Sequence, residues 1–273
     1  MKPPLGTFGD TVLVADVGNS RIKLAAVESW GGEGRLPTLG HRQELSSREF
    51  HPANLERWLA QVASGSTLLV VGSVHDAAAA RLEAAVAAVA ATAPRILRQR
   101  RVTHADLPLA VRLDEPQRVG IDRLASAAAA ATVRPSGSAA IVVDCGTAAT
   151  VGCISFDGAF VGGAILAGPA LLARALAEGT SRLPEVAILG SAPPPPMPGR
   201  STAEAIAAGI GWGIRGAIRE LVDRAREALG GTAQIYLTGG WRGAIRDVLP
   251  GAVEEPDLVL AGLALAANRA ARS

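Results

Sequence analysis

Aromatic side chains are scarce in this sequence, which has four Phe, four Trp and a single Tyr among its 273 residues. Proteins that bind single-stranded nucleic acid commonly stack the bases on aromatic rings. The shortage therefore argues against nucleic acid as a partner. Because 49% of the residues are nonetheless hydrophobic, the core has to be built from Ala, Val, Leu and Ile. A chain of this length suits two modest domains or one large one.

Cysteines and membrane signals are also sparse. Cys145 and Cys153 are the only cysteines, too few for a disulfide framework and typical of a reducing compartment. The N-terminus lacks the apolar core of a signal peptide. Charged residues interrupt the Ala-rich stretch 77–93, so it does not have the pattern of a membrane span. We expect a cytoplasmic protein with no membrane partner.

Neither sign of charge dominates, since 27 Lys and Arg face 25 Asp and Glu, for a net charge of +2. The densest basic run extends from Arg95 to Arg101 and contains Arg98 and Arg100. A solvated face is the first interpretation of such a run, and a patch for a partner or a phosphate is the alternative. No segment has the basic character expected of a DNA-contacting protein.

An apolar strand that ends in Asp-x-Gly occurs twice. The first copy ends at Asp16 and continues to Gly18, and the second ends at Asp144 and continues to Gly146. The two aspartates are 128 positions apart (144 minus 16), nearly half the chain. The repeat predicts two similar halves, each presenting a hairpin with an Asp-x-Gly turn.

The first loop has the chemistry of a phosphate site. Gly18 lets the backbone approach a ligand closely, and successive N–H groups of such a turn can bind phosphate oxygens. Asn19, Ser20 and Lys23 add donors, and Asp16 can hold Mg²⁺ through water. A plain hairpin turn explains the same residues, but the second copy shifts the balance to a phosphate site.

The second half offers matching groups. Thr147 can donate to a phosphate, and Asp144 offers a carboxylate to a cation. The segment Thr238-Gly239-Gly240 follows a strand and is suited to lie against the ribose and base of a nucleotide. Walker A and Rossmann fingerprints are both absent from the sequence, so a nucleotide enzyme here has to be of the two-hairpin type.

A catalytic base has to come from elsewhere, and segment 119–123 is the best candidate. Asp122 lies in the first turn of an expected helix, where the helix dipole favours its ionised form. Arg123 beside it can hold a carboxylate or phosphate with two parallel hydrogen bonds. An Asp that accepts a hydroxyl proton during phosphoryl transfer is a known arrangement. The alternative is an ordinary acidic residue at a helix start with a neighbouring ion pair.

Several blocks, in the same order along nearly the whole chain, resemble type III pantothenate kinases of the acetate kinase/sugar kinase/Hsp70/actin superfamily. These blocks are Asp16-Val17-Gly18-Asn19-Ser20-x-x-Lys23, Val119-Gly120-Ile121-Asp122-Arg123, Asp144-Cys145-Gly146-Thr147, Gly162-Gly163-Ala164-Ile165, Leu183-Pro184, Ser201-Thr202-x-Glu204-Ala205-Ile206-x-x-Gly209, Thr238-Gly239-Gly240 and Asp257-Leu258-Val259-Leu260-x-Gly262-Leu263. The resemblance implies an α/β fold with two similar ribonuclease H-like or actin-like domains, mixed sheets flanked by helices, and a nucleotide cleft between them. We expect the domains to be 1–118 and 119–273, each with one phosphate loop, and the closing helix to belong to the second.

The resemblance further implies ATP-dependent phosphorylation of pantothenate at its primary hydroxyl, the first step of coenzyme A synthesis. It implies Asp122 as the proton acceptor, Mg²⁺ with ATP, Asp144 as the ligand of a monovalent cation (K⁺ or NH₄⁺), and a homodimer that completes the pantothenate site near its interface. The implied ATP contacts are Asp16, Val17, Gly18, Asn19, Ser20, Arg21, Ile22, Lys23 and Thr147. The implied pantothenate contacts are Gly120, Ile121, Asp122, Arg123 and Thr202.

Two positions depart from the family pattern. Leu113 stands where the family commonly has a Tyr, and Ala149 stands where it commonly has a Thr. These departures motivate a second hypothesis, a catalytically weak or inactive nucleotide-binding regulatory or accessory protein on the same scaffold. A kinase for another small hydroxyl compound is the third.

Overall fold

The computed structural model describes residues 11–92, 96–188 and 194–272. The chain divides into two compact units, Met1–Val133 with Asp257–Ser273, and Arg134–Pro256. This division differs from the expected boundary between residues 118 and 119. Helix α3 (Ile121–Val133) packs on α6 (Leu258–Arg272), the closing helix, so both belong to the first unit. No helix within the described ranges is long and apolar enough to cross a membrane.

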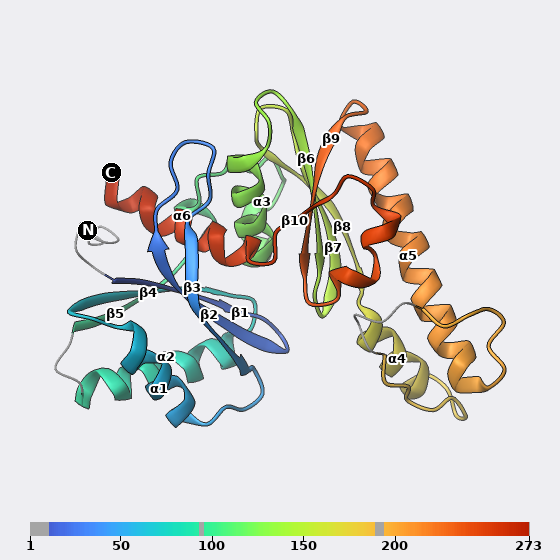
Figure 1. Cartoon of the computed structure of the whole chain (residues 1–273), viewed down its shortest axis with the longest axis horizontal. Coiled ribbons are helices and arrows are strands. Elements are labelled where there is room, and N and C mark those ends of the chain that lie inside the picture. The colour runs from blue at the N-terminus through green and yellow to red at the C-terminus, as the bar shows by residue number, and fades with distance from the viewer. Residues whose placement is uncertain (1–10, 93–95, 189–193, 273) are drawn as a thin grey trace. The chain divides into compact units, whose positions relative to one another are not determined.

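The first unit is built on a mixed five-stranded sheet with the order β3-β2-β1-β4-β5 (Figure 1). Its strands are β1 (Thr11–Val17), β2 (Arg21–Ser29), β3 (Thr38–Ser46), β4 (Ser66–Ser73) and β5 (Ile96–Arg101). The β1–β2 and β2–β3 pairs are antiparallel, whereas β4 runs parallel to both β1 and β5. The ends of β1, β4 and β5 therefore meet at one edge of the sheet.

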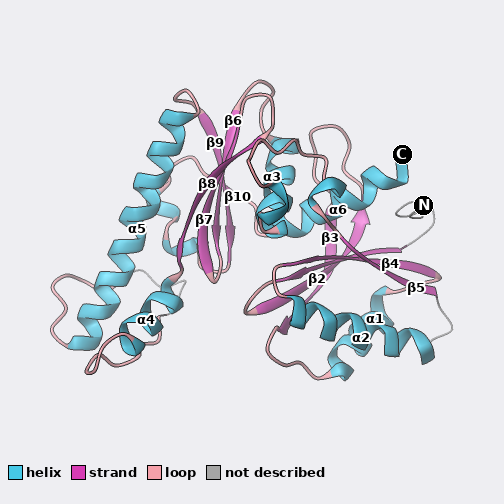
Figure 2. Cartoon of the chain, turned by 180° about the vertical axis from the view of Figure 1, so that it is seen from behind, coloured by secondary structure: helices cyan, strands magenta, loops and turns pink. Residues whose placement is uncertain are grey.

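Helices cover both faces of this sheet (Figures 1 and 2). Alternate residues of a strand point to opposite faces, and Leu13, Ala15 and Val17 of β1 pack in one core with helices α1 (Pro52–Val62) and α2 (Asp76–Thr92). Helix α6 contacts β1, β2 and β4, and α3 contacts β4. A three-residue 3-10 turn, Pro116–Arg118, leads to the start of α3.

The second unit repeats the same topology. Its strands are β6 (Ala139–Cys145), β7 (Ala148–Ile154), β8 (Phe160–Ala167), β9 (Ala233–Gly239) and β10 (Val253–Glu254). Their order is β10-β9-β6-β7-β8. Strand β6 pairs with its antiparallel hairpin partner β7 on one side and with the parallel strand β9 on the other. These are the relations of β1 to β2 and β4, so the predicted structural repeat is confirmed.

One long helix, α5 (Thr202–Ala228), serves two purposes in this unit. Its later turns pack Ile214, Ile218 and Val222 into the core of the sheet. Its first turns extend past the sheet (Figure 2) and pack Ile206 and Ile210 beside α4 (Pro169–Glu178). Ser201 is the N-cap of this helix. Its hydroxyl accepts a hydrogen bond from the backbone N–H of Glu204 at 3.2 Å, which gives a partner to one of the unpaired N–H groups of the first turn.

Gly262 allows α6 to lie directly on α3. A methyl group at this position would lie only 1.9 Å from the carbonyl oxygen of Ala125. We expect Gly262→Ala to lower the free energy of unfolding by about 1–3 kcal/mol, the usual cost of overpacking a core. Gly216→Ala, in α5, meets nothing within 4 Å and should instead stabilise by up to ~1 kcal/mol. Chemical denaturation of both variants tests the contact, and equal effects of the two changes would contradict it.

Candidate active site

The loop between β1 and β2 is a tight turn with an anchored underside. Asp16 and Lys23 are paired across the hairpin, and the Gly18 N–H donates to the carbonyl of Arg21 at 3.0 Å. Ser47, which follows β3, is buried and donates twice to the loop. Its hydroxyl donates to the carbonyl of Gly18 at 2.7 Å, and its N–H donates to the carbonyl of Ser20 at 3.1 Å. The Asn19 and Ser20 side of the loop is left exposed.

The segment that carries Asp122 lies at the same edge of the first sheet. The N–H of Val74, just after β4, donates to the carbonyl of Val17 at 3.1 Å. A side chain at Gly120 would lie 3.4 Å from the Val74 side chain. Val74 thus lies between the end of β1 and the start of α3. Val74, which sequence reasoning did not single out, therefore links the end of the strand before the 16–23 loop to the 120–123 segment.

Asp122 is a half-buried residue in the first turn of α3. Its Oδ1 accepts a hydrogen bond from the N–H of Arg123 at 2.8 Å. Gly120 provides the space, since a Cβ there would lie 2.5 Å from the same oxygen. Burial raises the pKa of Asp122 above its ordinary value, although the Arg123 N–H and the Arg123 charge both act to lower it. A carboxylate with a raised pKa is suited to accept a proton.

In the second unit, the strand after α5 closes against Asp144. Asp144 pairs with Thr150 across the β6–β7 hairpin. Gly239, at the end of β9, has a φ of +91°, and a Cβ there would lie 2.5 Å from Asp144 Oδ1. Only a glycine allows the backbone to adopt this conformation and to approach the carboxylate so closely. Gly239, which we expected against a nucleotide's ribose and base, lies against Asp144.

Two residues that the sequence reasoning missed hold the Asp144–Thr147 loop. The Trp241 indole Nε1–H donates to the carbonyl of Gly146 at 2.7 Å, and its backbone N–H donates to the carbonyl of Cys145 at 3.3 Å. On the other side, the N–H of Gly168 donates to the carbonyl of Thr147 at 3.1 Å. A side chain at Gly168 would collide with this carbonyl at 2.5 Å. Thr147 itself is exposed.

Thr202 occupies a different part of the second unit. It is the first residue of α5 and lies on an apolar groove of about 550 Å³ between α4 and α5. The groove is lined by Leu172, Ala175, Leu176, Leu183, Ala205, Ile206, Gly209, Ile210, Gly213 and Ile214 together with Thr202. Because α4 follows directly on Gly168, this helix connects the Thr147 loop with the groove.

The chemistry of a cation fits the two strand-end aspartates. Within the ranges the structure describes, no group of three or more His, Cys, Asp or Glu side chains could hold a metal ion. Mg²⁺ that arrives with a nucleotide needs only one or two carboxylates besides phosphates and water. Asp16 is such a carboxylate in the first unit, and Asp144 is one in the second. Burial raises the pKa of the Cys145 thiol, so it stays protonated and unreactive.

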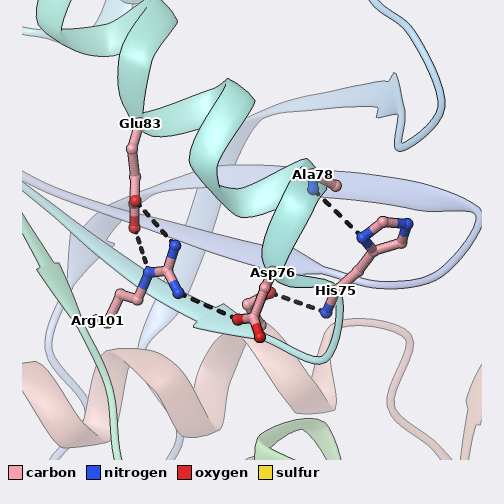
Figure 3. A network of polar contacts seen from close by, with 6 residues as sticks. His75, Asp76, Ala78, Glu83 and Arg101 are labelled. Atoms are coloured by element: carbon pink, nitrogen blue, oxygen red, sulfur yellow. Dashed lines mark hydrogen bonds and ion pairs between the residues drawn. The ribbon is translucent and has the colours of Figure 1, made fainter.

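The basic run on β5 is paired with carboxylates. Figure 3 shows Arg101 bonded to both carboxylate oxygens of Glu83, at 2.6 and 3.0 Å, and to Asp76 at 3.2 Å. The hydrogen bond to Glu83 raises the pKa of Arg101 further. Arg100 forms an ion pair with Asp106, and Arg95 lies outside the described residues. The contacts favour a structural role for this run over a phosphate patch.

The start of α2 is held in an unexpected way. Asp76 is the first residue of the helix, and its carboxylate is bonded to Arg101. The Nδ1 of His75 accepts from the Ala78 N–H at 3.2 Å instead (Figure 3). The His75 N–H donates to the Ser73 hydroxyl at 3.0 Å, which fixes the chain between β4 and α2.

Comparison with solved structures shows which proteins share the fold. A Campylobacter jejuni protein described as a candidate Baf-family transcriptional activator matches with a TM-score of 0.55 at 18% identity, over 96% of this chain and 100% of its own. A candidate 2-dehydro-3-deoxygalactonokinase from Sinorhizobium meliloti matches with a TM-score of 0.53 at 19% identity, over 94% and 96%. At such identities the likeness concerns the fold alone. Both structures share the two-unit α/β fold that the sequence predicted for this chain.

Sequence comparison defines the family. The family model for type III pantothenate kinase matches residues 12–224. A type III pantothenate kinase from Alkalilimnicola ehrlichii is 38% identical over 92% of this chain and 96% of its own. One from Rhodopirellula baltica is 35% identical over 91% and 95%. This chain belongs to the type III pantothenate kinase family, and it is therefore an enzyme of the phosphotransferase class.

Burial of Asp122 predicts a pH-dependent effect on stability. Because its pKa is higher in the folded protein than in the unfolded chain, the stability it contributes falls as the pH rises through the folded-state pKa. We expect Asp122→Asn to be more stable than the wild type at neutral pH, and the difference to shrink as the pH falls toward the ordinary Asp value of 3.8.

Urea unfolding at a series of pH values measures this difference. Asp114→Asn is the matched control, since it removes an exposed charge just upstream on the same connecting segment. An Asp122→Asn variant that is less stable than the wild type at neutral pH would contradict the assignment.

Proposed function

We propose that this chain transfers the γ-phosphoryl group of ATP to the primary hydroxyl of pantothenate, the first step of coenzyme A synthesis. The observation that carries the proposal is the half-buried Asp122 carboxylate, with its raised pKa, at the sheet edge that also presents the 16–23 loop. Membership of the type III pantothenate kinase family supports pantothenate as the substrate.

The geometry of the first unit suggests how the step proceeds. The Asp122 carboxylate takes the hydroxyl proton, while the N–H of Arg123 keeps Oδ1 in place. The hydroxyl oxygen then forms a bond to the γ-phosphorus as the bond from this phosphorus to the bridging oxygen of ADP breaks. The Arg123 guanidinium is proposed to hold the pantothenate carboxylate, with contacts from Gly120 and Ile121. Mg²⁺ bound with ATP supplies positive charge to the transferring phosphoryl group, and Asp16 is the residue proposed to hold it through water.

ATP is proposed to contact residues 16–23 and Thr147, and Asp144 to bind K⁺ or NH₄⁺. The exposure of Asn19 and Thr147, next to glycines whose carbonyls are anchored, supports these contacts. Ala149, which departs from the family pattern, is fully buried in the core of the second unit. A missing hydroxyl there changes the core rather than an exposed loop surface, which favours an active enzyme over the inactive alternative.

We also propose a homodimer in the cytoplasm. The apolar groove beside Thr202 supports a second copy as the partner that covers it, and the two free cysteines support a reducing compartment. Sedimentation analysis that finds only the 27.8 kDa monomer would contradict the dimer.

Replacing the proposed base separates chemistry from binding. We expect Asp122→Ala to lower kcat by about 10²- to 10⁴-fold, the usual contribution of a general base, while the Kd for ATP changes little. A coupled assay of ADP release with pantothenate, Mg²⁺ and K⁺ measures turnover, and calorimetry measures ATP binding. Asp114→Ala is the control. Unchanged turnover in Asp122→Ala would remove Asp122 from this role.

The wild-type protein in the same assay distinguishes the hypotheses. A folded protein that binds ATP but phosphorylates nothing would support the regulatory alternative. Phosphorylation of another hydroxyl compound in place of pantothenate would support a kinase of different specificity.

A further inference from the structure

The glycine carbonyls of the two Asp-x-Gly loops are held in the same way. The carbonyl of Gly18 accepts from the Ser47 hydroxyl at 2.7 Å, and the carbonyl of Gly146 accepts from the Trp241 indole N–H at 2.7 Å. Both donors are buried, Ser47 completely and Trp241 to all but 7%. Gly18 and Gly146 occupy equivalent places in the repeat, each two residues after its strand-end aspartate.

The two donors are not themselves part of the repeat. Ser47 follows β3, the outer strand of the hairpin side, and lies 29 positions after Gly18. Trp241 follows β9, the parallel neighbour of β6, and lies 95 positions after Gly146. One is a hydroxyl and the other an indole. The two units thus reach the same contact with unrelated side chains from different elements, which indicates that the contact itself is required.

Anchoring a carbonyl fixes the direction of the next N–H. In a planar trans peptide the C=O and the N–H of the following residue point in opposite directions. With the carbonyls of Gly18 and Gly146 turned toward buried donors, the N–H groups of Asn19 and Thr147 are directed away from those donors. Both residues are exposed. Backbone N–H groups held in advance toward an anion stabilise it without rearranging when it binds.

The donors are themselves held in place. The Ser47 N–H donates to Ser20, and the guanidinium of Arg81 donates to the Ser47 carbonyl. The Trp241 N–H donates to Cys145, the residue before Gly146. Each donor therefore contacts its loop at two points, once through its side chain and once through its backbone N–H.

We propose that Ser47 and Trp241 are positioning residues for the nucleotide phosphates, each orienting one loop amide through a glycine carbonyl. The inference rests on the proposed function and deepens it, since it assigns residues that set the affinity for ATP and not for pantothenate. Each side chain is bonded to a loop carbonyl, and in this proposal it acts through its loop alone.

Removing each donor tests the proposal. Ser47→Ala and Trp241→Phe should each raise the Kd and the KM for ATP·Mg²⁺ by about 3- to 10-fold, the value of one such hydrogen bond. The double variant should raise them by about 10- to 100-fold, because the two sites lie in different units and their effects should add. The KM for pantothenate should stay within about twofold in all three.

Matched controls separate positioning from stability. Thr67 is fully buried and its hydroxyl donates to the carbonyl of Ser64 at 3.2 Å, so Thr67→Val removes a comparable bond at the opposite end of β4. Trp58 is 4% exposed and its indole donates to the carbonyl of His41 at 2.5 Å, so Trp58→Phe matches Trp241→Phe. Both controls should lower Tm and leave the Kd for ATP unchanged.

A variant that changes only the hydrogen bond guards against a folding defect. Placing β-(3-benzothienyl)alanine at position 241 keeps the shape of the ring and replaces its N–H by sulfur. The same rise in the ATP Kd is expected there. Unchanged ATP affinity in this variant and in Ser47→Ala, with Tm lowered as in the controls, would overturn the proposal.

Calorimetry measures the Kd for ATP·Mg²⁺ without requiring turnover, so it tests the roles of Ser47 and Trp241 independently of the proposed reaction. A wild type that binds ATP·Mg²⁺ without phosphorylating pantothenate would contradict the proposed function, while the Kd values of the variants would still decide the roles of Ser47 and Trp241. A wild type with no affinity for ATP·Mg²⁺ would overturn both.

Discussion

The parallel pairing of each Asp-x-Gly strand with a later strand is the constraint on which both units depend. β4 runs beside β1 and β9 runs beside β6, so the residues that follow them reach the edge where Asp16 and Asp144 end their strands. Val74 and Gly239 are placed at these edges in this way. Val74 lies against Gly120, and Gly239 lies against the Asp144 carboxylate. The hairpins provide the loops, and the parallel strands bring the residues that complete the surroundings.

Much of this fold follows from patterns that are visible along the chain. The apolar runs at β1, β4 and β6 are buried strands, and the Ala-rich segments are helices because their apolar residues recur at helical spacing. Strand β3 gave no such signal, since most of Thr38–Ser46 is polar and its place in the sheet comes from pairing with β2. The start of α3 at Asp122 was predictable, whereas the packing of α3 on α6, which places both helices in the first unit, was not.

The candidate site likewise contains residues that the sequence predicts and residues that only the structure reveals. Asp16, Asp122 and Asp144 could be selected because their chemistry and their neighbours in the sequence already suggest a phosphate or a proton. Ser47, Gly168 and Trp241 carry no local signal, because a serine after a strand or a tryptophan after two glycines has many ordinary explanations. Their contacts with the loops exist only after distant segments have paired. A sequence pattern identifies groups that meet the ligand more readily than groups that hold those groups in place.

Asp122 shows what this arrangement requires of the fold. Partial burial makes the ionised Asp122 carboxylate unfavourable in the folded state, and Gly120 leaves room for its oxygen. The loops at Gly18 and Gly146 also carry a free-energy penalty. Each needs a buried polar donor, a hydroxyl in one unit and an indole in the other, at a position that an apolar side chain could have filled. In both cases this free energy is lost when the chain folds, so that neither the proposed base nor the proposed loop amides would have to reorganise during phosphoryl transfer. The proposed base in the first unit and the loops of both units are therefore alike in being fixed in place when the chain folds.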